Sequence, residues 1–68
     1  MNRLKEIMAY RGMTCVELGY RVGRHRKAIM SYRSGEAFPF VHVALRIARE
    51  LGVTVEDIWG DAATGGMR

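Results

Sequence analysis

The residues best suited to bind a ligand are basic side chains that crowd into one short segment. Residues 18–35 contain no Asp or Glu and five basic side chains: Arg21, Arg24, Arg26, Lys27 and Arg33. The other fifty residues carry six basic and seven acidic side chains, so the net charge of +4 comes entirely from this segment. A local excess of cations is typical of a surface that binds a polyanion. The alternative is a solvated basic face without a ligand.

The remaining polar side chains do not form a catalytic or metal-binding set. Cys15, His25 and His42 lack the clustered spacing of metal ligands. No Ser-His-Asp or Cys-His set stands at workable positions, and the glycine-rich phosphate-loop motif is absent. We therefore expect no enzyme activity, no metal and no cofactor. Cys15 could be an oxidant-sensing thiol, but a small, half-buried structural residue is the favoured interpretation.

Length and composition limit the fold to one small domain. The chain has 68 residues, of which 49% are hydrophobic, enough for a compact core but too few residues for a Rossmann fold, a barrel or a propeller. A single cysteine cannot form an internal disulfide. No apolar run approaches the ~20 residues that span a bilayer, and the N-terminus lacks a signal-peptide core. We expect a soluble, cytoplasmic protein.

Caps, glycines and apolar spacing predict five short helices and no strand. Asn2 would cap the first helix and Gly12 end it, and the T-x-x-E sequence from Thr14 to Glu17 would form a reciprocal capping box for the second. Thr54 would cap the last helix. The expected helices cover residues 3–11, 15–22, 25–34, 41–51 and 55–59. Residues 1–60 would form the domain, and residues 61–68 a flexible C-terminal tail.

Apolar residues at helical spacing are the expected core. Leu4, Ile7 and Met8 would face inward from the first helix. The inward residues expected from the next three helices are Val16, Leu18 and Val22; then Ala28, Ile29 and Tyr32; then Val41, Ala44, Leu45, Ala48 and Leu51.

The second and third predicted helices are separated by only a tight, glycine-containing turn. Two helices joined in this way form a helix-turn-helix, whose second helix enters the DNA major groove. Arg24, Arg26 and Lys27 lie at or just before the start of that second helix. This end reaches base edges in such docking, and its free N–H groups favour phosphate.

Residues 2–59 resemble the phage repressor/Cro family of helix-turn-helix domains, also called XRE-type or Cro/C1-type regulators. The resemblance rests on NRLKEI, on GMTCVELG and the following VG, and on AI within the third predicted helix. It continues through SG and PFVHVALRIARELGVTVEDIW without a gap. It implies a compact, all-α, five-helix, lambda-repressor-like domain that binds operator DNA.

The resemblance also implies roles for individual residues. Four side chains of helix 25–34 would read bases: Arg26, Lys27, Met30 and Ser31. Six residues would contact the DNA backbone: Thr14, Cys15, Arg21, Arg24, His25 and Arg33. His25 is either only the cap of this helix or also a DNA contact.

The sequence departs from the family pattern at five positions. Cys15 replaces a common Gln that anchors to the DNA backbone, and Gly19 replaces a common Ala. Met8 and Arg33 stand where the family often pairs an Arg with a Glu, which would leave Arg33 free to reach phosphate. Phe40 replaces a polar cap, so the start of the fourth helix is poorly specified.

The function predicted from these features is a sequence-specific, double-stranded-DNA-binding transcriptional regulator, a small bacterial or phage repressor acting on a palindromic operator. A homodimer would double the half-site. Its interface would comprise Phe38, Phe40, Val41 and Trp59. Trp59 and Tyr32 are otherwise expected to be core aromatics rather than platforms on which bases stack. The alternative function is an antitoxin-like or other protein-interaction module that binds DNA only secondarily.

Overall fold

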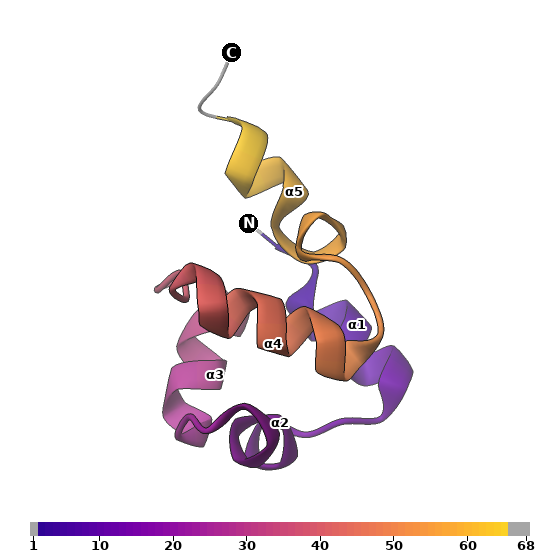
Figure 1. The fold of residues 1–68 in the computed structure, drawn as a ribbon. Helices are drawn as coiled ribbons and strands as arrows, with labels where there is room; N and C mark the ends of the chain where they lie inside the picture. Colours follow the sequence, from indigo (N-terminus) through magenta and orange to yellow (C-terminus); the bar gives the residue numbers. More distant parts are fainter. Residues whose placement is uncertain (1, 66–68) are drawn as a thin grey trace.

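The computed structural model describes the backbone of residues 2–65 and the side chains of residues 2–60, and it contains five α-helices (Figure 1). Residues 2–65 include no strand, which confirms the predicted all-α class and the number of helices. The helices are α1 (Leu4–Arg11), α2 (Cys15–Val22), α3 (Arg26–Ser34), α4 (Val41–Leu51) and α5 (Val55–Gly65).

Helices α2 and α3 lie at one end of the molecule and α5 at the other, with α4 and α1 between them (Figure 1). Helix α4 packs against α1, α2 and α5, whereas α3 packs against α2 and α1. The buried core gathers side chains from all five helices: Leu4, Met8, Leu18, Val22, Ile29, Val43, Ala44, Ile47, Ala48, Leu51, Ile58 and Trp59. Packing of Leu18, Val22 and Ile29 into this core fixes the positions of α2 and α3.

Three residues predicted to face the core are exposed instead. Val16 of α2 is 58% exposed, and Val41 and Leu45 of α4 are 75% and 51% exposed. Successive residues of a helix turn by about 100°, so a residue two positions from a buried one lies roughly on the opposite side. Val16 stands in this relation to Leu18, and Leu45 to Ile47. The prediction for α4 was therefore wrong at Val41 and Leu45, which belong to its exposed side and not to its buried face.

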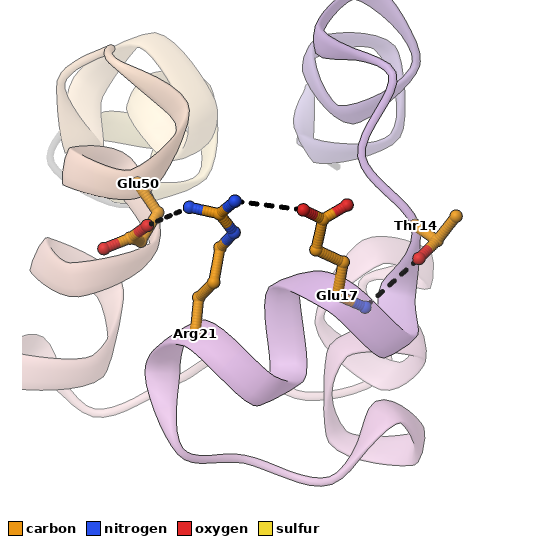
Figure 2. Close-up of polar contacts among 4 residues, drawn as sticks. All are labelled: Thr14, Glu17, Arg21 and Glu50. Atoms are coloured by element: carbon orange, nitrogen blue, oxygen red, sulfur yellow. Dashed lines mark hydrogen bonds and ion pairs between the residues drawn. The ribbon is translucent and has the colours of Figure 1, made fainter.

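The two Thr caps differ from each other. Thr14 Oγ1 accepts a hydrogen bond from the backbone N–H of Glu17 at 3.1 Å, as predicted. The carboxylate of Glu17 does not complete the predicted reciprocal box, because it bonds to Arg21 instead (Figure 2). The complete box lies at α5, where Thr54 Oγ1 accepts from Asp57 N at 3.0 Å and Asp57 Oδ2 accepts from Thr54 N at 2.9 Å.

The start of α1 and the end of α5 both differ from the prediction. The N-cap of α1 is Arg3 rather than the predicted Asn2, although Asn2 Oδ1 accepts a hydrogen bond from Leu4 N at 2.9 Å. The side-chain amide of Asn2 also donates to the carbonyl of Tyr32 at 2.8 Å. Helix α5 continues to Gly65 rather than ending near Trp59. Alanines 62 and 63 favour helix and help to carry it past Gly60. The flexible tail predicted for residues 61–68 therefore overlaps the helix through residue 65, and residues 66–68 lie outside the described residues.

Candidate nucleic-acid interface

The turn between α2 and α3 lies directly against α2. The backbone N–H of Arg24 donates to the carbonyl of Gly19 at 2.8 Å, and Gly23 turns the chain with a φ of 72°. A side chain at residue 19 has no room, because its Cβ would overlap the carbonyl oxygen of Arg24. Glycine at this position therefore lets the turn rest directly on α2, which sets where α3 begins.

His25 caps α3 through its ring. Its Nδ1 accepts a hydrogen bond from the backbone N–H of Lys27 at 3.1 Å. An accepting Nδ1 carries no proton in this arrangement, so the proton of the neutral ring is on Nε2. The predicted capping role is confirmed, and Nε2 is left as a donor beside the start of α3.

A shallow groove runs between the start of α2 and the exposed side of α3. Its lining contains three cationic side chains and no carboxylate: Met13, Thr14, Cys15, Val16, Arg26, Lys27, Met30 and Arg33. Six residues predicted to contact DNA thus meet in one place, although they come from two segments of the sequence. The N-terminus of α2 adds free backbone N–H groups at the edge of the groove, which favour an anion.

Ser31 and Arg24 are not part of the groove lining, whereas Arg33 is. Ser31 borders a second depression on α3 together with Lys27 and Met30. Arg24 is exposed in the turn, and its guanidinium donates to the carbonyl of Gly23 at 3.1 Å. Arg33 lines the groove and forms no ion pair with any described residue, and Met8, at the other position of the family's ion pair, is buried in the core.

Arg21 differs from the other cations because two carboxylates hold it. Its guanidinium contacts Glu17 at 3.0 Å and Glu50 of α4 at 3.2 Å (Figure 2). The hydrogen bond to Glu17, followed by that to Glu50, raises the pKa of Arg21 above its ordinary value. Arg46 also donates to the carbonyl of Arg21 at 3.2 Å. This arrangement fastens α2 to α4 and does not favour the phosphate contact predicted for Arg21.

The residues predicted for a dimer interface divide into two groups. Phe38, Phe40 and Val41 are exposed, and we call them the aromatic patch. Trp59 is only 1% exposed, so its side chain belongs to the core and is not part of the surface. Its ring lies beneath Phe38, with 5.4 Å between the ring centroids. The structure therefore confirms Trp59 as a core aromatic and contradicts its assignment to the dimer interface.

The described residues also lack the features of two other kinds of site. They contain no group of three His, Cys, Asp or Glu side chains that could hold a metal ion. None of their helices is long and apolar enough to cross a membrane.

The chain is similar to archaeal proteins that are named for the helix-turn-helix (HTH) motif. An uncharacterized HTH-type transcriptional regulator of Archaeoglobus fulgidus is 35% identical over 58 residues, which cover 85% of this chain and 83% of the relative. A second from the same organism is 39% identical, with 85% and 82% covered. One from Methanocaldococcus jannaschii is 33% identical, with 85% and 88% covered.

No family model matches the chain. The archaeal relatives nevertheless cover most of it, and the structure contains the two helices and the tight turn from which their motif takes its name. The chain therefore belongs to the family of HTH-type transcriptional regulators.

Proposed function

We propose that this protein is a Cro-like repressor that binds a palindromic operator as a homodimer, with α3 in the major groove. The observation that carries the proposal is the groove between α2 and α3, which is lined by Arg26, Lys27 and Arg33 without a carboxylate. Cations at the start of a helix are disfavoured by its dipole, so an anionic ligand explains their position better than solvation does. Because DNA is the ligand, the proposed location is the cytoplasm.

Base reading is assigned to the exposed side of α3. Arg26 in its first turn can make the bidentate contact to guanine O6 and N7, and Lys27 can read guanine or bind phosphate. Met30 and Ser31 lie one turn further along the same helix. Side chains that contact bases determine which DNA sequence is bound, whereas side chains that contact the DNA backbone only position the protein.

Phosphate contacts are assigned to the surroundings of the groove. Thr14 and Cys15 lie at the N-terminus of α2, and Arg24 and His25 lie in the turn. No carboxylate of residues 2–60 forms an ion pair with Arg33. Arg21 is left out of this set, because its guanidinium already pairs with Glu17 and Glu50.

The aromatic patch is assigned to the second subunit. Phe38, Phe40 and Val41 expose apolar surface in the loop before α4 and at its start. A dimer would place two α3 helices about one turn of DNA apart, roughly 34 Å, and would thereby double the half-site. In the alternative function, an antitoxin-like module, a different protein would cover the same patch.

Binding to two duplexes tests the proposal. Fluorescence anisotropy at physiological salt would compare the DNA upstream of the protein's own gene with a scrambled duplex of equal length. We expect tight, salt-dependent binding to the first and much weaker binding to the second. Equal, weak binding to both would contradict the proposal and would favour the protein-interaction module.

A further inference from the structure

Two apolar side chains lie uncovered in the most basic part of the molecule. Val16 in the first turn of α2 is 58% exposed, and Met30 of α3 is 50% exposed. Both line the groove that contains Arg26, Lys27 and Arg33. Their neighbours Met13 and Cys15 pack against the core, whereas Val16 and Met30 do not. Neither side chain is therefore needed to complete the described core.

The groove combines two requirements on its occupant. Three cations and no carboxylate select an anion, and the pair of Val16 and Met30 selects an apolar group on that anion. In the major groove of DNA, the apolar group that the bases present is the methyl on carbon 5 of thymine. A 5-methylcytosine carries the same methyl at the same ring position.

We infer that Val16 and Met30 form a contact for the 5-methyl group of a pyrimidine, beside the base pair that Arg26 reads. The inference rests on the proposed function, because it needs α3 in the major groove. It assigns a reading role to α2, whose first turn supplies Val16, as well as to α3. Each half-site should then contain a 5-methylpyrimidine next to the guanine that Arg26 contacts.

The test exchanges thymine for uracil, which removes the methyl group and leaves every hydrogen-bonding atom in place. A duplex pool with a randomised core of roughly 20 base pairs, about two turns of DNA, is first enriched for binding to the full chain. The enriched duplex is then made with uracil at one thymine position at a time. We expect one position in each half-site at which uracil weakens binding about fourfold, as for the loss of one buried methyl group.

Two variants link that position to the groove, and a third serves as a control. Val16→Ala and Met30→Ala should each reduce the preference for thymine over uracil at the sensitive position. Leu45→Ala should keep the preference, because Leu45 is similarly exposed, at 51%, but lies on α4 outside the groove. The ratio of the two affinities is compared within each variant, so a change in overall affinity does not affect the result.

Cytosine and 5-methylcytosine at the same position distinguish the two sources of the methyl group. Tightest binding with thymine identifies thymine as the source, and tightest binding with 5-methylcytosine identifies the modified base. Specific binding that tolerates uracil at every position would overturn the inference and leave the proposed function intact. A thymine preference that survives in both variants would also overturn it. Failure to bind any duplex would refute the proposed function, and the inference with it.

Discussion

At the scale of single residues, Gly19 determines how closely the turn approaches α2. A Cβ at this position would overlap the carbonyl oxygen of Arg24 and lie 3.3 Å from the backbone nitrogen of Arg26. Both are backbone atoms, so they cannot rotate away as a flexible side chain could. We expect Gly19→Ala to destabilise the fold by about 1–3 kcal/mol, which outweighs alanine's better helix propensity.

Urea denaturation of the Gly19→Ala variant measures this effect, and Gly60→Ala is its matched control. Gly60 is also a helical glycine, but among the side chains that the structure describes no atom lies within 4 Å of the Cβ that alanine would add there. Gly60→Ala should therefore be as stable as the natural chain or more stable. An equally stable Gly19→Ala variant would show that the turn can move away from α2 at little cost.

Two arginines of the basic segment should behave differently toward DNA. Arg26→Ala is expected to lose roughly 1–3 kcal/mol of binding free energy on the operator and to relax base preference at one position.

Arg21→Gln should leave the dependence of affinity on salt nearly unchanged, because Glu17 and Glu50 already pair with Arg21. Titrations of operator and random DNA over a salt series measure both effects. A salt slope that falls by about one unit in Arg21→Gln would mean that Arg21 exchanges its carboxylates for phosphate.

At the scale of helices, the start of α5 depends on the box formed by Thr54 and Asp57. The hydrogen bond from the backbone N–H of Thr54, and then that from its side chain, lowers the pKa of Asp57 below its ordinary value of 3.8. A carboxyl group with a lowered pKa in the folded state stabilises the fold above its unfolded pKa. That contribution is lost as the pH falls through the folded-state pKa.

Thermal unfolding between about pH 7 and pH 2.5 tests this contribution in an Asp57→Asn variant. At neutral pH the variant should have the lower Tm, and the difference should shrink as the pH falls below about 4. Glu56→Gln is the control, because Glu56 lies in the same turn without a hydrogen bond between its side chain and any described residue. An Asp57→Asn difference that stays constant over the whole range would show that the charge of Asp57 does not act through the box.

Local signals predicted the helices better than the contacts between them. The four glycines predicted to end helices are all C-caps with positive φ, because this requirement depends only on the backbone next to the glycine. The inward face of α4 was only partly predicted, since Val41 and Leu45 share its apolar character but face solvent. Which apolar residues are buried depends on the neighbouring helices, and spacing alone does not identify those.

At the scale of the whole molecule, the candidate site was predictable in its composition but not in its assembly. The excess of positive charge between residues 18 and 35 can be read from the sequence. The second partner of Arg21 could not be predicted, because Glu50 lies 29 positions away on α4. Val16 was missed as a groove residue because a valine at the start of an amphipathic helix resembles a core residue. Its position two residues before Leu18 was the signal that could have found it.

The proposed dimer leads to a prediction about the aromatic patch. Phe40 is 77% exposed, so Phe40→Asp should leave the monomer folded, while a buried charge at the subunit interface should prevent association. If the operator is bound by two linked subunits, its affinity should then fall toward that of a half-site, by on the order of 100-fold. Analytical ultracentrifugation measures the association of the subunits, and operator titrations on the same samples measure the affinity. Tyr10→Ser is the control, because Tyr10 is also exposed, at 86%, but lies on α1 outside the patch. A natural chain that is monomeric at high concentration, and a Phe40→Asp variant that binds the operator as tightly, would assign the patch to a different partner protein.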